Sequence, residues 1–440
     1  MLDLHQMAAE ARDSFYVLAS SSGDARNDAL RNMASVLSER AEEVFAANRE
    51  DMAKAEEGHL AAPLLHRLKF GPEKMDQVVR GLGSLQSLPD PLGTTTLSTE
   101  LVPGLELYRV TCPIGVVGVI FESRPDALVQ IASLCIKSGN AVLLKGGSEA
   151  MRTNAALCDC IREALRRSGL PENGVQLLAS REDVAAMLKE DELIDLVIPR
   201  GSNAFVRYIM DNSRIPVLGH SDGLCHVYID RDADPETALR VAVDSKTQNV
   251  SVCNAAETIL VHEDIAPAIL PALVRKLQEK GVEVRGDEAV QRIVPCVPAS
   301  EADWSTEYLD YIVSIKVVPS LQDAVTHINR FGSHHTDAVV TKDRQAAADF
   351  LNRVDSAGVY WNVSTRFADG FVYGFGAEVG IATGKIHARG PMGLEGLTTY
   401  KYKLLGSGQT MAEMKAQGSP YTHLPLHKAD PTSLRKETEK

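Results

Sequence analysis

Between Gly115 and Pro199 the sequence alternates short apolar runs with longer amphipathic stretches. The runs read, in order, GVVGVIF, NAVLLKG, GVQLL and IDLVIP. The stretches between them carry apolar residues at the three-to-four spacing of helices. Strands that alternate with helices predict right-handed βαβ units and a parallel sheet. Such sheets bind nucleotides outside the carboxyl ends of their strands, so we expect an α/β fold with a Rossmann-type cofactor domain.

A second region of the same kind follows the first. The runs CHVYID, AAETILVH, YIVSIKVV and DAVVT predict further strands, with helices between them. Residues 3–57 and 72–87 predict helices, and residues 98–112 predict a hairpin. A last strand is expected near 397–406, and the polar residues 407–440 are typical of a disordered tail.

The composition argues against several functions. The formal net charge of −13 disfavours a nucleic-acid partner, which would normally meet a basic face. The longest apolar run is far shorter than the ~20 residues of a membrane-spanning helix. The charged N-terminal residues do not resemble a secretory signal. The 7 cysteines are scattered and form no CxxC pair, so we expect a cytoplasmic protein with no metal site.

Two turns after predicted strands have the residues of an anion site. In AVLLKGGSEA, Lys145 ends a strand, Gly146 and Gly147 follow, and Ser148 opens a helix. A helix N-terminus beside a lysine attracts anions, although a plain tight turn with a capping serine gives the same pattern. The turn in VIPRGSNAFV repeats the form with an arginine, Gly201 and Ser202. No GxGxxG fingerprint or P-loop is present.

Cys253, in KTQNVSVCNAAETILVH, lies just before a predicted strand and not inside it. A cysteine in a soluble protein is usually a small buried hydrophobe. Here polar side chains, among them Asn254, surround the sulfur and could receive an oxyanion. The spacing therefore leaves two readings open, a structural cysteine and a nucleophile that forms an acyl intermediate.

Five long motifs carry a resemblance to a known family. They are GVVGVIFESRPDALVQIASLCIKSGNAVLLKGGSEA, QNVSVCNAAETILVHEDI, EYLDYIVSIKVV, GSHHTDAVVT and STRFADGFVYGFGAEVGIATGKIHARGPMGLEGLTTYKY. In this order they closely resemble the gamma-glutamyl phosphate reductases of the aldehyde dehydrogenase superfamily. The resemblance runs from the N-terminal helices to about Gly408. It implies an aldehyde-dehydrogenase-like fold with a cofactor domain at 1–222, a catalytic domain at 223–395, and an end strand and polar tail at 396–440. The hairpin at 98–112 and the end strand are expected to mediate homo-oligomerisation.

The resemblance also implies a reaction. Cys253 matches the cysteine nucleophile of the family, which reduces L-glutamyl 5-phosphate with NADPH to glutamate 5-semialdehyde and phosphate in proline biosynthesis. The thiolate would displace phosphate to give a thioester, which hydride then reduces. The kinase that makes the acyl phosphate is expected to be a separate glutamate 5-kinase. The rival readings are a hydrolytic aldehyde dehydrogenase and an inactive protein on the same fold.

The site residues follow from the same matches. In the position of the hydrolytic glutamate base our alignment has His220, which favours a reductase but could itself act as a base. Arg124 stands where hydrolytic members have an asparagine and could hold phosphate. The resemblance assigns cofactor binding to Lys145, Gly147, Ser148, Gly201, Ser202 and Glu307. Substrate binding is expected among Arg124, Asn254, Arg366, His387 and Arg389, with Asp369 a further candidate.

Overall fold

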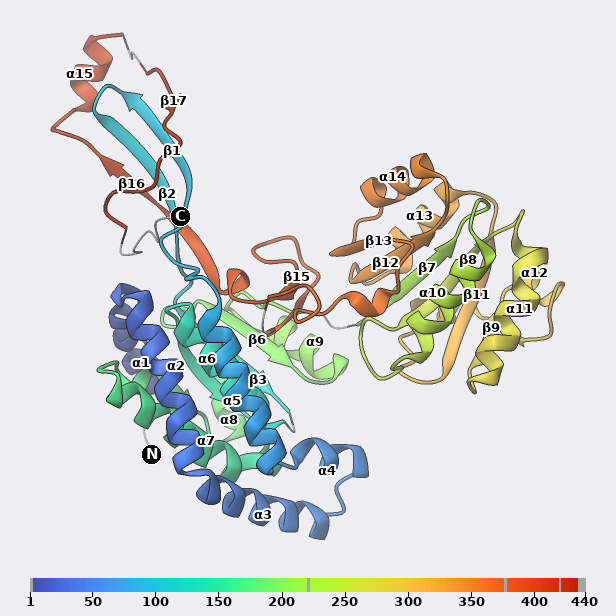
Figure 1. Ribbon diagram of the computed structural model, residues 1–440, viewed down its shortest axis with the longest axis horizontal. Coiled ribbons are helices and arrows are strands. Elements are labelled where there is room, and N and C mark those ends of the chain that lie inside the picture. Colours follow the sequence, from blue (N-terminus) through green and yellow to red (C-terminus); the bar gives the residue numbers. More distant parts are fainter. Residues whose placement is uncertain (1–2, 123, 220–221, 376–377, 419–420, 434–440) are drawn as a thin grey trace.

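The computed structural model describes residues 3–122, 124–219, 222–375, 378–418 and 421–433. It has two α/β bodies and a narrow arm that projects from the first body (Figure 1). Among these residues no helix is both long and apolar enough to cross a membrane.

The first body is built on a parallel sheet with the strand order β5-β4-β3-β6. Its strands are β3 (Val116–Phe121), β4 (Ala141–Lys145), β5 (Val175–Leu177) and β6 (Leu196–Arg200). These are the four predicted apolar runs, and nearly all their side chains are buried, as in a sheet covered by helices. The strand order reverses between β3 and β6, and such a reversal opens a crevice at the carboxyl ends of the two strands.

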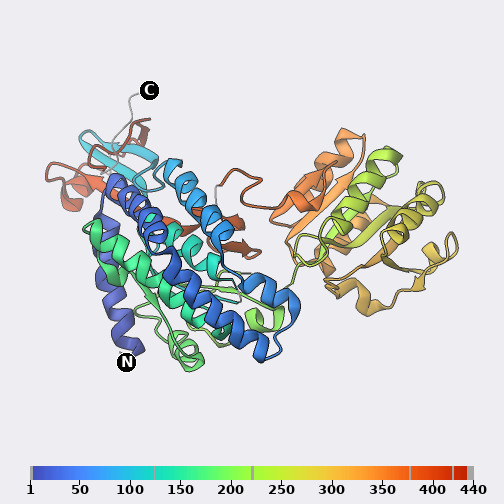
Figure 2. The ribbon, with the colours of Figure 1, turned by 60° about the horizontal axis from the view of Figure 1, so that its bottom comes forward.

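Helices cover this sheet (Figure 2). α6 and α7 pack against the strands and carry α2 on their outer side, whereas α1 packs against β3, β4 and β5 beside α8. The helices are α1 (Leu4–Ser20), α2 (Gly23–Glu39), α3 (Ala41–Glu57), α4 (Ala62–Leu68), α5 (Pro72–Ser87), α6 (Pro125–Lys137), α7 (Met151–Arg167), α8 (Arg181–Met187) and α9 (Asn203–Asn212). Gly139 adopts φ 73° just after α6, a conformation that ends helices and favours glycine.

The second body is a seven-stranded parallel sheet with the order β10-β9-β11-β8-β7-β12-β13. The strands are β7 (Cys225–Ile229), β8 (Ala256–His262), β9 (Glu283–Gly286), β10 (Val297–Pro298), β11 (Ile312–Val318), β12 (Thr336–Val340) and β13 (Gly358–Trp361). The helices are α10 (Pro235–Thr247), α11 (Ala266–Glu279), α12 (Glu288–Gln291), α13 (Leu321–Phe331) and α14 (Arg344–Arg353). Successive strand residues face opposite sides, so Val227 joins the core under α10 and α11, and Tyr228 stacks on Phe350 of α14.

The arm is an antiparallel sheet with the order β16-β2-β1-β17. Its strands are β1 (Thr95–Val102), β2 (Leu105–Pro113), β16 (Thr398–Leu405) and β17 (Leu424–Pro425). The predicted hairpin and the predicted end strand therefore pair with each other although they lie far apart in the sequence.

The expectation of a disordered tail after residue 407 is wrong for the part that the structure describes. Helix α15 (Met411–Ala416) follows β16, and β17 then pairs with β1. Asp430 is buried and accepts a hydrogen bond from Lys403 at 2.5 Å and one from the backbone of Thr432. The polar composition of residues 407–440 suggested disorder. The segment is ordered in part because β17 pairs with the edge of β1, which would otherwise be unpaired.

Residues near the C-terminal end of the predicted catalytic domain return to the first body. β14 (Gly380–Ala382) and β15 (Gly390–Met392) pair with each other, and Val379, Ala382 and Met392 belong to the hydrophobic core of the first sheet. The chain thus crosses between the two bodies twice. The domain division at residues 223 and 396 stays a prediction.

Candidate active site

Cys253 lies in the loop between α10 and β8, three residues before β8 begins. Two contacts fix the loop from behind. A Cβ at Gly223 would lie 2.2 Å from the Cys253 carbonyl oxygen, so only glycine permits this approach. The Cys225 thiol donates a hydrogen bond to the same carbonyl oxygen at 3.2 Å. The backbone of Cys253 is therefore held beside the amino ends of β7 and β8 in the second sheet.

The neighbouring Asn254 ties the loop to a distant segment. Its Nδ2 donates to the Ala368 carbonyl oxygen at 2.9 Å, and its own carbonyl oxygen accepts from Thr365 Oγ1 at 2.7 Å. Asn254 is buried, and its Oδ1 has no hydrogen-bond partner among the described residues. These bonds fix Asn254 in the interior, while the neighbouring Cys253 stays partly exposed.

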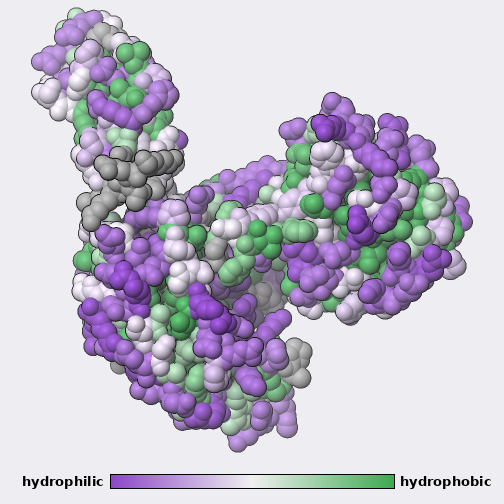
Figure 3. Space-filling view, in the orientation of Figure 1, coloured by the Kyte–Doolittle hydropathy of each residue, from purple (hydrophilic) through white to green (hydrophobic). Residues whose placement is uncertain are grey.

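Cys253 opens into a cleft of about 760 Å³. The cleft lies at the strand-order reversal of the first sheet, because residues that follow β3 and β6 form much of its lining. The space-filling view shows the surface hollowed between the two larger bodies (Figure 3). Five of the predicted site residues line this cleft, namely Arg124, Gly201, Ser202, Cys253 and Glu307.

The environment of Cys253 favours the neutral thiol. Burial, with a smaller contribution from the carboxylates of Glu307 and Glu378, raises the pKa of Cys253 to about 12 against the opposing charge of Arg200. The Cys253 thiol therefore needs a group that takes its proton, or an added positive charge that stabilises the thiolate, when it attacks.

Glu307 connects the two bodies across the cleft. Its Oε1 accepts a hydrogen bond from the Gly223 backbone at 2.9 Å, and its Oε2 accepts one from Asn203 Nδ2 of α9. Two residues later, the Leu309 backbone donates to Glu257 Oε1 at 3.3 Å. Glu257 forms a fully buried ion pair with Lys246 at 2.6 Å, which anchors the Glu307 loop beside the nucleophile.

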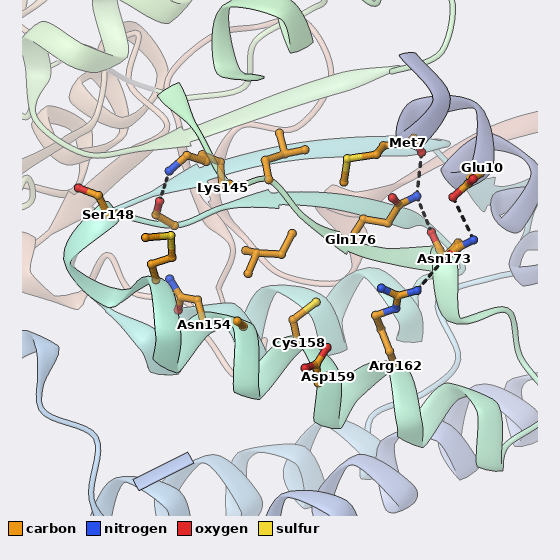
Figure 4. Close-up of a pocket in the computed structure, with 17 residues that line it drawn as sticks. Met7, Glu10, Lys145, Ser148, Asn154, Cys158, Asp159, Arg162, Asn173 and Gln176 are labelled. Atoms are coloured by element: carbon orange, nitrogen blue, oxygen red, sulfur yellow. Dashed lines mark hydrogen bonds between the residues drawn. The ribbon is translucent and has the colours of Figure 1, made fainter. Parts of the chain in front are cut away.

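A second pocket, of about 410 Å³, lies beside the carboxyl end of β4 (Figure 4). Lys145, Gly147 and Ser148 line it, as predicted for the cofactor turn. Asn154 of α7 is buried on its wall, and its Oδ1 has no partner among the described residues. The pocket thus offers a cation, a hydroxyl and an unsatisfied amide to a ligand.

Helix α1 forms another wall of this pocket, which the sequence did not predict. Gln176 Nε2 donates to the Met7 carbonyl oxygen at 2.7 Å, and Asn173 Nδ2 donates to Glu10 Oε2 at 3.2 Å. Arg162 Nη2 in turn donates to Asn173 Oδ1 at 2.9 Å. No local motif marks these residues, because their meeting depends on how α1 packs on the sheet.

The predicted substrate residues outside the cleft are tied to other groups. Arg366 Nε donates to Gln248 Oε1 at 2.8 Å, and Arg389 Nη1 donates to Asp355 Oδ1 at 3.2 Å. The His387 ring lies 2.9 Å from the Gly396 carbonyl oxygen. Together with Asn254, these residues are not among the described residues that line either space.

The remaining predictions have different outcomes. Asp369 caps the turn that follows it, accepting from the Phe371 backbone at 2.8 Å. His220 lies outside the described residues. Arg124 caps α6 and pairs with Asp126 at 2.9 Å, so its charge is already compensated.

Two cleft residues were missed as site candidates. Arg200 ends β6, and the turn motif that contains it was a signal for it. Glu378 lines the same cleft from a loop far along the sequence, and burial raises the pKa of its carboxyl group. Nothing local in the sequence marks Glu378.

Comparison with known proteins decides the family. The model of the aldehyde dehydrogenase family matches residues 2–313. A gamma-glutamyl phosphate reductase from Acetivibrio thermocellus is 56% identical over 430 residues, covering 98% of this chain and 100% of that protein. The crystal structure of a gamma-glutamyl phosphate reductase from Thermotoga maritima matches with a TM-score of 0.91 and 41% identity, covering 93% of this chain and 100% of that one. This chain belongs to the gamma-glutamyl phosphate reductase family.

Membership of the gamma-glutamyl phosphate reductase family confirms the resemblance of the motifs and the α/β fold of the aldehyde dehydrogenases. More distant structures share the fold alone. An engineered glycolyl-CoA reductase with bound NADP⁺ matches with a TM-score of 0.62 at 16% identity. The roles of individual gamma-glutamyl phosphate reductase residues in this chain stay predictions.

Proposed function

We propose that this chain reduces L-glutamyl 5-phosphate with NADPH to glutamate 5-semialdehyde and phosphate, the second step of proline biosynthesis from glutamate. The observation that carries the proposal is the position of Cys253. In a chain of this family, it opens from a fixed loop into the cleft where the first sheet reverses its strand order. Family membership supports the substrate class, and the opening of Cys253 into the cleft supports its role as the nucleophile.

In the proposed mechanism, the Cys253 sulfur attacks the acyl carbon and phosphate leaves, so a thioester forms. When bound, NADPH supplies the hydride that reduces this thioester. The hemithioacetal anion that results collapses to the aldehyde and the Cys253 thiolate, which takes up a proton from solvent. The backbone N–H groups of the Cys253 loop are proposed to stabilise the oxyanion that develops on the acyl oxygen.

The two spaces fit the two ends of the cofactor. Beside β4, Lys145, Gly147 and Ser148 are proposed to hold the adenosine end, and the unsatisfied Asn154 Oδ1 supports a polar ligand there. Ser148 carries no negative charge, so it would accept the 2′-phosphate that distinguishes NADPH. Gly201, Ser202 and Glu307 line the cleft with Cys253, which supports a role at the nicotinamide end.

The amino-acid end of the substrate is proposed to lie among Asn254, Arg366, His387 and Arg389. Arg366 is the candidate with the strongest link to the nucleophile. Burial lowers the pKa of Arg366, and the negative charge of a Cys253 thiolate opposes that effect, so the two groups interact electrostatically. Arg124 remains a candidate for the phosphate.

We also propose that the arm mediates homo-oligomerisation. β16 is an edge strand, and its side chains Tyr400, Tyr402 and Leu404 are exposed on one face of the arm. An unpaired edge with apolar side chains is a surface that proteins normally cover. A cytoplasmic location and supply of the acyl phosphate by a separate glutamate 5-kinase complete the proposal.

The test runs the reaction backwards, because acyl phosphates are labile. The enzyme is mixed with pyrroline-5-carboxylate, which is in equilibrium with glutamate 5-semialdehyde, and with NADP. NADPH formation is followed with and without inorganic phosphate. We expect turnover to depend on phosphate. Equal rates without phosphate would show that water cleaves the thioester, and the chain would then be a hydrolytic aldehyde dehydrogenase.

A further inference from the structure

Arg200 is a charged residue at the floor of the Cys253 cleft that none of the assignments above uses. It is the last residue of β6, beside Phe121 at the end of β3. The residues that follow β3 and those that follow β6 both line the Cys253 cleft. Arg200 therefore stands at the strand-order reversal, where sheets of this type bind ligands.

Among the residues that the structure describes, Arg200 has no carboxylate within ion-pairing distance, although the Glu378 carboxylate stabilises its charge from farther away. Its one hydrogen bond among the described residues runs from Nη1 to the Glu378 carbonyl oxygen at 3.5 Å. It forms no ion pair with any residue that the structure describes. Arg200 is partly buried in the lining of the cleft, and burial lowers the pKa of its guanidinium while the Glu378 carboxylate opposes that effect. A partly buried charge without a directly bonded counter-ion is costly, so such a group normally has a partner.

The other arginines near the cleft are either paired with a carboxylate or exposed to water. Arg124 pairs with Asp126 at 2.9 Å. Arg207, on the helix that follows Arg200, pairs with Asp222 at 3.0 Å. Arg67 is exposed, so water solvates its charge. Arg200 alone among these four is a partly buried residue of the cleft lining that has no direct ion pair with a described carboxylate.

Arg200 is also close enough to the nucleophile to affect it. Its charge favours the Cys253 thiolate, and the thiolate in turn favours the charged guanidinium. A ligand group that contacts Arg200 would therefore lie beside the reacting sulfur. The guanidinium fork matches phosphate oxygens in a bidentate manner, which a lysine at this place could not reproduce.

We propose that Arg200 binds the phosphoryl group of the substrate in the cleft and holds the inorganic phosphate that leaves. This inference rests on the proposed function and adds to it the residue that recognises the leaving group. Arg124, whose charge Asp126 compensates, then has a secondary part in phosphate binding.

The assignment accounts for the proton in the first step. The S–C bond forms, and the acyl C–O bond breaks with its electron pair moving to the phosphate oxygen. The thiol proton leaves on that phosphate as hydrogen phosphate, so a neutral Cys253 thiol needs no separate acceptor. Arg200 stabilises the negative charge that grows on the departing oxygen.

The test is the phosphate-dependent reverse reaction of the full-length enzyme, with Arg200→Met compared with the wild type. We expect the KM for inorganic phosphate to rise about 10- to 100-fold, because a charge-assisted pair is lost. The KM for NADP and for the aldehyde should stay nearly unchanged. Arg207→Met is the matched control, since it removes an arginine that is exposed and paired with Asp222, and it should leave all three constants unchanged.

A second measurement detects phosphate binding in variants that have lost catalytic activity. Inorganic phosphate should slow the alkylation of Cys253 by iodoacetamide in the wild type, and Arg200→Met should lose this protection. Arg200→Lys, which keeps the charge and loses the fork, should retain part of it.

Two results would overturn the proposal. One is an Arg200→Met enzyme whose KM for phosphate and whose protection match the wild type. The other is a rise confined to the KM for NADP, which would assign Arg200 to the cofactor. A wild type that shows no dependence on phosphate would instead remove the proposed function itself, so the two failures are distinguishable.

Discussion

The pocket beside β4 and the cleft over Cys253 are built in different ways. The pocket takes its predicted residues from a single turn, Lys145 to Ser148, and the helices of the same body complete its walls. The cleft joins segments that are far apart in the sequence. Cys253 and Glu307 come from the second body, Arg200 from β6, and Glu378 from the returning C-terminal segment.

This difference has a consequence for function. A site within one body keeps its geometry whatever the other body does, whereas a site between bodies changes when they move relative to each other. Substitutions in the cleft should therefore leave cofactor binding in the pocket beside β4 nearly unchanged. The same substitutions should lower the rate of the reaction at Cys253. The predictions below test this separation.

The largest effect is expected at the nucleophile. Cys253→Ala should lower turnover about 10⁴-fold or more, because no thioester can form. NADPH binding, measured by fluorescence, should survive, because the pocket beside β4 does not include Cys253. Cys112→Ala, a change at a half-exposed thiol of the arm, is the control and should keep full activity. Substantial turnover by Cys253→Ala would contradict the covalent mechanism.

The next effect concerns the protonation of Cys253 in the free enzyme. Because burial raises the pKa of Cys253 to about 12, the thiol is protonated at neutral pH and its thiolate fraction grows as the pH rises. The rate of alkylation by iodoacetamide should increase about 1000-fold between pH 7 and pH 10. The measurement is mass spectrometry of the Cys253 peptide over time. A rate that levels off near pH 8 would mean that the resting site already stabilises the thiolate.

A smaller effect is expected in the pocket. Ser148→Glu places a carboxylate beside Lys145 and should raise the KM for NADPH about 10- to 100-fold by repelling the 2′-phosphate. The KM for NADH should change much less. Ser148→Ala adds no charge and serves as the matched control. Equal losses for both cofactors would remove Ser148 from the discrimination between them.

The smallest effect separates two predicted substrate residues. Arg366→Met should raise the KM for the aldehyde about tenfold, because its charge interacts with the Cys253 site. Arg389→Met should instead lower the free energy of unfolding by about 1 kcal/mol, because its side chain bonds to Asp355 and to the Thr383 carbonyl oxygen. Steady-state kinetics and chemical denaturation measure the two effects. The reverse pattern would assign substrate binding to Arg389.

The sequence predicted the parts of this molecule that depend on local patterns. The four strands of the first sheet, four of the seven strands of the second sheet and the turn after β4 follow from apolar periodicity and glycine, which act over a few residues. The strands β9, β10 and β13 were not predicted. The position of Cys253 before a strand is local in the same sense. The family motifs then supplied the reaction, which periodicity cannot provide.

The rest could not be predicted because it depends on distant partners. The substrate role of Arg389 stays a prediction, whereas its ion pair with Asp355 could not be read from its motif. Glu378 reaches the cleft only because the chain returns to the first body, and the segment around Asp430 is ordered because β1 offers an edge. A charged side chain has the same sequence signature whether another residue or a ligand neutralises it.

The most direct test of the central claim is a search for the glutamyl thioester on Cys253. The enzyme is mixed with pyrroline-5-carboxylate and NADP without phosphate, quenched, and digested for mass spectrometry while NADPH is followed. The account predicts a burst of about one NADPH per active site. It also predicts a glutamyl group on the Cys253 peptide that added phosphate removes. A burst that leaves Cys253 unmodified, or a glutamyl group on another residue, would contradict it.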